Sequence, residues 1–177
     1  MHIVQDGDEV LRKTATPVAK KEFGGPELKK LLEGMARTLD AQPDGVALAA
    51  PQIGVSKRIF IVRYDRMNHA SEVEESGELS SAKKIEIGVF INPTFIRRSR
   101  RKHDVEEGCL SVRGIYGTTS RHERATVKAY DEHGKLFERG GGGILAQAFQ
   151  HETDHLDGIL FIDHAVKTRK VHKDTDV

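Results

Sequence analysis

The residues of this chain that could do chemistry are concentrated in a His-Glu-X-X-His segment, in which His151 and His155 stand four positions apart with Glu152 beside the first. On an α-helix, side chains four positions apart lie one above the other, so the two imidazoles could bind a single metal ion. Glu152 could then exchange protons with a water molecule at that ion. The segment therefore indicates metal-dependent hydrolysis.

The surrounding sequence favours a short helix here, although the motif alone could arise by chance in a chain with nine histidines. At about 100° per residue, Ile144 and Ala148 fall on the same face as the two histidines. Glycines at 140–143 are expected to end any earlier element, and Gly158 suits the left-handed residue that follows a helix. We therefore expect a buried helix whose inward face carries both imidazoles.

A hydrolytic site of this kind needs a third ligand, because such sites use three protein ligands and leave a fourth position for water. Phe161 occupies the position where the extended metzincin pattern carries a third histidine, which leaves His164 as the downstream alternative. Cys109, the only cysteine, is the better candidate. A single cysteine forms no intramolecular disulfide, so Cys109 packs, attacks a substrate or binds a metal.

A third segment, from Gly45 to Gly54, contains mostly small residues and one amide side chain, that of Gln52. It could be no more than a tightly packed turn. It could also offer a backbone that a peptide approaches closely, with Gln52 as a hydrogen-bond donor.

Taken in order, the segments at 45–54, 107–111 and 150–155 resemble the three signature motifs of the peptide deformylases. The resemblance covers most of the chain, because residues 8–18 look like the family's leader and residues 143–163 look like its metal-binding helix. It implies that Cys109, His151 and His155 bind one divalent metal ion and that Glu152 is the catalytic acid and base. It also implies Fe²⁺ as the physiological ion, with Zn²⁺ or Ni²⁺ possible in purified protein.

The substrates implied by the resemblance are N-formylmethionyl nascent peptides, which would be hydrolysed to formate and a free amino terminus. Gln52 and the backbone N–H of Leu110 would stabilise the charge that develops on the formyl oxygen. Glu107 could instead support a metal ligand from behind. The expected substrate-binding residues are Gly45, Val46, Ala47, Glu107, Gly108 and Ala148, with the first three presenting backbone to an added peptide strand.

Two positions depart from the family pattern, and both concern specificity more than activity. Ala47 stands where the family usually has glycine, and Arg113 stands where many relatives have proline. The segment 65–84 is also longer and more polar than the corresponding hairpin of short bacterial members. We expect it to be mobile.

Composition is consistent with a single catalytic domain over residues 1–177 that binds neither DNA nor a membrane. The formal net charge is +1, and no apolar run approaches the roughly 18 residues that a membrane span needs. The first residues lack a signal peptide, so we expect a bacterial cytoplasmic protein, with an organelle as the alternative. Residues 165–177 are expected to form a solvated polar tail, with contact of its basic residues with ribosomal RNA as the alternative. Contact with the ribosome is expected to be transient.

The predicted fold is α+β, with antiparallel strands around the central metal-binding helix and a second helix near the N-terminus. Leucines at helical spacing and Pro26 at the first turn predict the N-terminal helix over 26–41. Gly134 suits the turn of a hairpin. Strands are predicted at 57–64, 88–92, 94–105, 125–130 and 135–139.

Two other functions compete with deformylation. A metallopeptidase that cleaves internal amide bonds would use the same histidine pair but would need a longer groove and no cysteine motif. A non-catalytic protein with a closed metal site would need a fourth protein ligand, for which His164 or a carboxylate is available.

Overall fold

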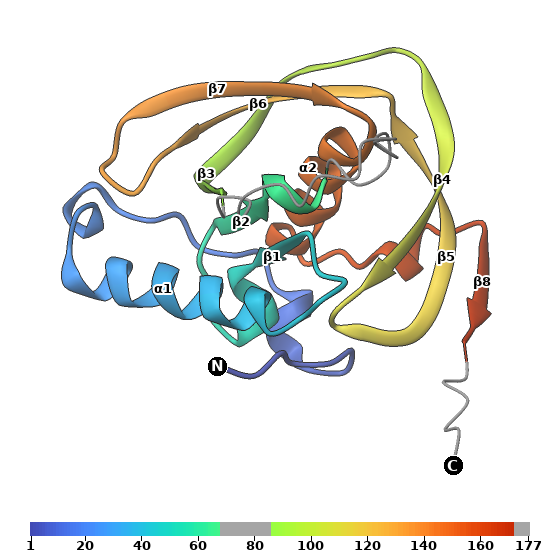
Figure 1. Cartoon of the computed structure of the whole chain (residues 1–177), viewed down its shortest axis with the longest axis horizontal. Helices are drawn as coiled ribbons and strands as arrows, with labels where there is room; N and C mark the ends of the chain where they lie inside the picture. The colour runs from blue at the N-terminus through green and yellow to red at the C-terminus, as the bar shows by residue number, and fades with distance from the viewer. Residues whose placement is uncertain (68–85, 172–177) are drawn as a thin grey trace, which may run out of the picture.

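The computed structural model describes residues 1–67 and 86–171 of the chain (Figure 1). It contains two antiparallel sheets, one ordered β1-β2-β3-β6-β7 and the other β4-β5-β8. Helix α2, Gly143–Leu156, lies between the two sheets, and helix α1, Pro26–Asp40, lies across the outside of the larger one. The α+β prediction, with a central helix that carries the His-Glu-X-X-His segment and an N-terminal helix, is therefore confirmed.

The strands agree with the predicted ones in part. The larger sheet consists of β1 Ala47–Ala49, β2 Ile59–Arg63, β3 Ile87–Arg98, β6 Arg124–Tyr130 and β7 Leu136–Gly142. The smaller sheet consists of β4 Lys102–Cys109, β5 Val112–His122 and β8 Lys167–Lys170. The sequence interpretation did not include β1, β5 or β8.

Three expectations need correction. The predicted strand over 94–105 is two strands, because the chain turns around residues 99–101 and passes from the larger sheet to the smaller one. The glycines at 140–142 do not end the preceding element, because they continue the pairing of β7 with β6. Part of the expected polar tail forms β8, although its side chains are exposed.

The core holds α2 by its apolar face. Phe149 is fully buried and packs its ring 5.2 Å from that of Phe90, which in turn stacks 4.7 Å from Phe60. Burying one such side chain contributes roughly 1.5–3 kcal/mol, so this cluster fixes the helix against the larger sheet. The opposite side of α2 is left to face the smaller sheet.

The end of α2 confirms the role predicted for Gly158. Its φ is +76°, and a Cβ there would lie 2.8 Å from the carbonyl oxygen of Arg12. Both the left-handed conformation and the close approach of the N-terminal segment therefore require glycine.

The segment 65–84, which we expected to be mobile, lies outside the described residues from position 68 onward. The part that is described, residues 65–67, belongs to the 3₁₀ turn Tyr64–Arg66 after β2 and to its C-terminal cap. Within residues 1–67 and 86–171, no helix is long and apolar enough to cross a membrane.

Candidate metal centre

Cys109, His151 and His155 come together between β4 and α2. Their ligand atoms all lie within 4.8 Å of one another, and the Cys109 Sγ is 3.2 Å from the His155 Nε2. The two imidazole rings are 4.9 Å apart, as expected for residues one turn apart on a helix. One sulfur and two nitrogens are donors that zinc and related divalent ions accept, so the three residues fit a metal ion.

The turn after β4 delivers the cysteine to this position. The pairing of β4 with β5 shifts register between Gly108 and Cys109, and the chain reverses to begin β5 at Val112. The Ser111 backbone N–H and the Gln52 side-chain amide each donate to the Cys109 Sγ, at 3.4 Å. These two donors hold the sulfur beside the histidines, where a thiolate could bind a metal ion.

A buried ion pair supports His151 from behind. The Glu107 carboxylate lies 3.2 Å from the His151 Nδ1, and Arg121 donates to it from Nε at 2.7 Å and from Nη2 at 3.0 Å. Arg121 also reaches Asp154 at 2.7 Å. Burial opposes ionisation of Glu107, but the hydrogen bonds from His151 and Arg121 outweigh it and lower its pKa to about 2. The ionised carboxylate therefore favours a proton on Nδ1, which leaves Nε2 free for a metal.

Arg121 was not singled out as functional by the sequence. Its contact with Glu107 depends on the register of the β4–β5 hairpin, in which Glu107 pairs with Gly117 and His103 with Arg121. The two residues are not directly opposite each other in the hairpin, and the contact forms because the arginine side chain is long. No spacing rule in the sequence predicts it.

Glu152 has the environment of a group that exchanges protons. Burial raises its pKa to about 7, and its Oε2 has no hydrogen-bond partner among the described residues. A buried carboxylate oxygen without a partner is uncommon in folded proteins and points to a water molecule or substrate as its partner. Proton exchange is most efficient when the pKa of the group lies near the working pH.

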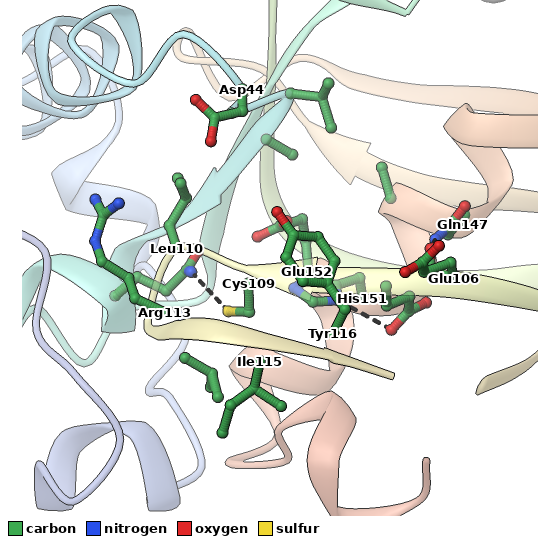
Figure 2. Close-up of a pocket in the computed structure, with 18 of the residues that line it drawn as sticks. Asp44, Glu106, Cys109, Leu110, Arg113, Ile115, Tyr116, Gln147, His151 and Glu152 are labelled. Atoms are coloured by element: carbon green, nitrogen blue, oxygen red, sulfur yellow. Dashed lines mark hydrogen bonds and ion pairs between the residues drawn. The ribbon is translucent and has the colours of Figure 1, made fainter. Parts of the chain in front are cut away.

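A cavity of about 800 Å³ opens beside this cluster (Figure 2). All three segments that the sequence singled out contribute to its walls. Cys109, His151 and His155 are called the metal-type cluster below. His155 belongs to this cluster but does not line the cavity. The lining includes these residues named from the sequence: Gly45, Val46, Ala47, Gln52, Glu107, Gly108, Cys109, Leu110, Ala148, His151 and Glu152.

The downstream alternatives for the third ligand lie elsewhere. His164 contacts Asp154, with its Nε2 3.3 Å from that carboxylate, and does not belong to the cluster. Phe161 is buried and stacks on His151 with ring centroids 6.3 Å apart. Among the described residues, the group that could hold an ion at this site therefore consists of one cysteine and two histidines.

Both departures from the family pattern lie at the cavity. Ala47 is buried within β1, where its backbone pairs with Val62 of β2. Arg113 is exposed, and its Nη2 donates to the Gln42 side chain at 2.6 Å. Figure 2 shows Arg113 with Leu110 on one side of the pocket, and Tyr116, Glu106 and Gln147 toward the other. Those last three residues were not predicted as site residues.

Comparison with known proteins gives the same picture along nearly the whole chain. The polypeptide deformylase family model matches residues 1–171. A peptide deformylase from Desulfitobacterium hafniense is 43% identical over 169 residues, which cover 95% of this chain and 96% of that protein.

Solved structures of peptide deformylases share the fold. One from Legionella pneumophila is 40% identical, with a TM-score of 0.76 over 92% of this chain and 83% of its own. A Met-Ala-Ser-bound class I type b peptide deformylase from Acinetobacter baumannii is 32% identical, with a TM-score of 0.77 over 93% and 98%. The family model spans all three motifs and every residue of the cluster, and this chain belongs to the polypeptide deformylase family.

Proposed function

We propose that Cys109, His151 and His155 bind the divalent metal ion with which this deformylase removes the formyl group from N-formylmethionyl peptides. The observation that carries the proposal is the position of the Cys109 Sγ, which completes a three-ligand set with the histidines beside an open cavity. The partnerless Glu152 carboxylate at the same cavity supports hydrolysis.

Within this reaction, Glu152 handles the protons. A divalent ion held by the three ligands would lower the pKa of bound water toward about 7 and polarise the formyl carbonyl. Glu152 accepts a proton from the water that attacks the formyl carbon. It then returns that proton to the amine as the carbon–nitrogen bond breaks, which releases formate and a free amino terminus.

Gln52 and the backbone N–H of Leu110 are the proposed donors to the formyl oxygen as it gains negative charge. The Gln52 Oε1 accepts a hydrogen bond from the Ala49 N–H at 2.8 Å, which directs its Nε2 toward Cys109. Gln52 is buried, so the amide is held before the substrate arrives. Losing one such donor typically costs about 2.7–4 kcal/mol of transition-state stabilisation. Near-normal turnover of Gln52→Ala would reject this role.

The substrate is proposed to lie along the backbone of residues 45–47, with its methionine side chain between that segment and α2. Val46, Leu110, Ala148 and His151 line this part of the cavity. The Acinetobacter baumannii relative is described as bound to Met-Ala-Ser, a peptide with the sequence that deformylation of formyl-Met-Ala-Ser would give. Main-chain pairing would bind many sequences, as an enzyme for nascent chains requires.

We propose Fe²⁺ as the physiological ion, with Zn²⁺ or Ni²⁺ able to replace it during purification. The thiolate and imidazole donors of this site suit all three ions, and affinity alone would favour zinc over iron. Occupancy therefore depends on availability, and metal analysis of anaerobically prepared protein tests it directly.

We propose that a transient contact with the ribosome is made by the turn between β3 and β4 together with the adjoining strand ends, residues 97–102, here called the arch. The basic residues Arg97, Arg98, Arg100, Arg101 and Lys102 are exposed there, although the whole chain carries a net charge of only +1. Such a cluster suits RNA phosphates, and its binding should weaken as salt is raised. Co-sedimentation with ribosomes that is insensitive to both salt and charge reversal at the arch would reject this contact.

The cytoplasm of a bacterium is the proposed compartment, and the bacterial origin of the Desulfitobacterium relative supports it. An organelle remains the alternative. Fractionation of the native cells distinguishes the two.

The decisive experiment is formate release from formyl-Met-Ala-Ser by iron-loaded protein, with the metal content measured in parallel. Glu152→Gln should bind metal normally and lose at least a hundredfold in turnover, since general acid–base catalysis contributes roughly that much or more. Equal rates for Glu152→Gln and wild type would favour a closed structural metal site. Cleavage of an unformylated internal peptide would favour a metallopeptidase.

A further inference from the structure

The smaller sheet carries a row of three residues in register that ends beside the metal-type cluster. Gly108 of β4 pairs with Tyr116 of β5, and Tyr116 pairs with Arg169 of β8. Gly108 directly precedes Cys109 in the chain. The C-terminal strand is therefore connected across one row to the strand that presents the cysteine.

Side-chain contacts follow the same row. The Arg169 guanidinium lies over the Tyr116 ring, 5.2 Å from its centroid. The ring in turn covers Gly108 so closely that a Cβ at that position would lie 2.8 Å from a ring carbon. Arg169 also donates to the Glu106 carboxylate from Nε at 3.0 Å. Tyr116 is thus held between a glycine on one side and a cation on the other.

Two residues of this row, Gly108 and Tyr116, form part of the cavity wall. Glu106, Gly108 and Tyr116 line the cavity, and so does Val171, whose N–H donates to the Gly114 carbonyl at 2.8 Å just beyond β8. Figure 2 shows the Tyr116 ring standing in the pocket near Cys109, with Glu106 beyond it. The catalytic groups lie deeper, since Glu152 is 4% exposed and Tyr116 is 38% exposed.

Among the described residues, Arg169 makes the side-chain hydrogen bonds and the cation–π contact of β8. All four side chains of the strand are exposed, and none belongs to the hydrophobic core. Its other attachments are backbone hydrogen bonds to β5. The guanidinium therefore contributes to the orientation of Tyr116, while backbone pairing with β5 holds the strand itself.

We infer that Arg169 is a positioning residue, which holds the Tyr116 ring as the wall against which the residues after methionine bind. The inference rests on the proposed function, since it assigns specificity at the same cavity. Tyr116 contacts the substrate directly in this scheme, and Arg169 acts through Tyr116. Formylmethionine itself, which binds deeper, is unaffected by the row.

The test compares two substrates, formyl-Met-Ala-Ser amide and formyl-Met amide, with wild type and Arg169→Ala. The amides remove the peptide carboxylate, so that direct attraction to Arg169 cannot mimic an effect of positioning. Arg169→Ala should raise KM for the longer substrate roughly two- to fivefold, the size of one exposed cation–π contact, with kcat unchanged. KM for the shorter substrate should stay the same.

Two further variants separate positioning from general loss of structure. Lys167→Ala changes another exposed residue of β8, one that makes no side-chain hydrogen bond or ion pair among the described residues, and should leave both KM values unchanged. Tyr116→Ala should reproduce the KM effect, and adding Arg169→Ala to it should raise KM no further, because both changes remove one interaction.

An unchanged KM for the longer substrate in Arg169→Ala overturns the inference, as does an equal rise for both substrates. Additive effects in the double variant also overturn it. If the wild type hydrolyses neither substrate, the proposed function itself fails. Circular dichroism of each variant identifies any that has lost its fold, and in that case Arg169→Gln, which keeps most of the side-chain length but removes the cation, provides the same comparison.

Discussion

Two neighbouring glutamates of β4 each form an ion pair with an arginine. The two pairs have the same charged groups but differ in burial. Glu107 and Arg121 expose 2% and 7% of their side chains, whereas Glu106 and Arg169 expose 55% and 61%. Successive residues of a strand point to opposite faces, so the first pair faces α2 and the second does not. One step along the strand therefore separates a residue that supports the candidate metal centre from a residue at the rim of its cavity.

The comparison shows how burial decides what an ion pair can do. A buried pair pays a desolvation penalty, and removing one partner leaves an uncompensated charge that is strongly destabilising. An exposed pair is screened by water and contributes little to stability. The inner pair can therefore fix a histidine rigidly, while the outer pair can orient an aromatic ring without determining whether the protein folds.

The largest expected effect comes from breaking the inner pair. Arg121→Ala should lower the free energy of unfolding by about 3–5 kcal/mol, because Glu107 then remains buried without its cation. Arg101→Ala is the matched control, since its partner Glu123 lies 3.2 Å away at the surface. Urea unfolding measures both variants. A loss below about 1 kcal/mol for Arg121→Ala would contradict the comparison.

The next effect is measured as metal affinity, on variants that remain folded. Glu107→Gln keeps the shape of the side chain but weakens the hydrogen bond to the His151 Nδ1, so metal affinity should fall about 10- to 100-fold. Glu106→Gln, one position away on the exposed face, should leave the affinity unchanged. Competition with a chromogenic chelator gives both values. Equal affinities for the two variants would remove the distinction between the pairs.

A third ion pair, between Arg63 and Asp65, lies between the other two in burial and extends the comparison to pH. Arg63 donates to both carboxylate oxygens of Asp65, at 2.8 and 2.7 Å, and these hydrogen bonds lower the Asp65 pKa to about 2. Because the pKa is lowered in the folded state, the stabilisation is present above about pH 4 and is lost as pH falls through 2. Asp65→Asn should therefore cost about 1 kcal/mol or less at pH 7.

That cost should shrink as the pH falls to about 2, because about half of the wild-type carboxylates are then protonated. Denaturant unfolding of both proteins at the two pH values measures the change. A difference between variant and wild type that stays constant from pH 7 to about pH 2 would show that the Asp65 charge is not the source of the stabilisation.

The smallest effect is expected for the stability of Arg169→Ala. Its ion pair with Glu106 is exposed, so the variant should lose only about 0.2–1 kcal/mol of unfolding free energy. A loss as large as that of Arg121→Ala would show that the outer pair carries structural weight. Thermal and urea unfolding, measured beside Arg121→Ala, place the two pairs on one scale.

Much of the fold could be predicted from local patterns. The helical spacing of leucines located α1, and the strands at β2, β6 and β7 were recognised from β-branched residues and a glycine turn. The prediction of one strand over 94–105 was wrong at the arch, because a run of basic residues gives no sequence signal that the chain passes from one sheet to the other. Strand β8 was missed because its composition is that of a solvated tail, and only pairing with β5 makes it a strand.

The sequence by itself determined the chemical equipment of this protein. Two histidines one helical turn apart, a glutamate between them, a lone cysteine and a small-residue segment with one glutamine are fixed by residue type and short spacing. Such features survive without tertiary information because helix geometry relates positions i and i+4 wherever the helix lies.

Only the tertiary structure decided how that equipment is supported. The contact of Arg121 with Glu107 and Asp154, and the row from Gly108 through Tyr116 to Arg169, join residues far apart in the chain. Strand register and sheet twist bring them together, and these follow from packing of the whole domain and not from any local preference. Residue types therefore indicated metal-dependent hydrolysis, whereas packing decided which charges are buried behind the site and which remain at its rim.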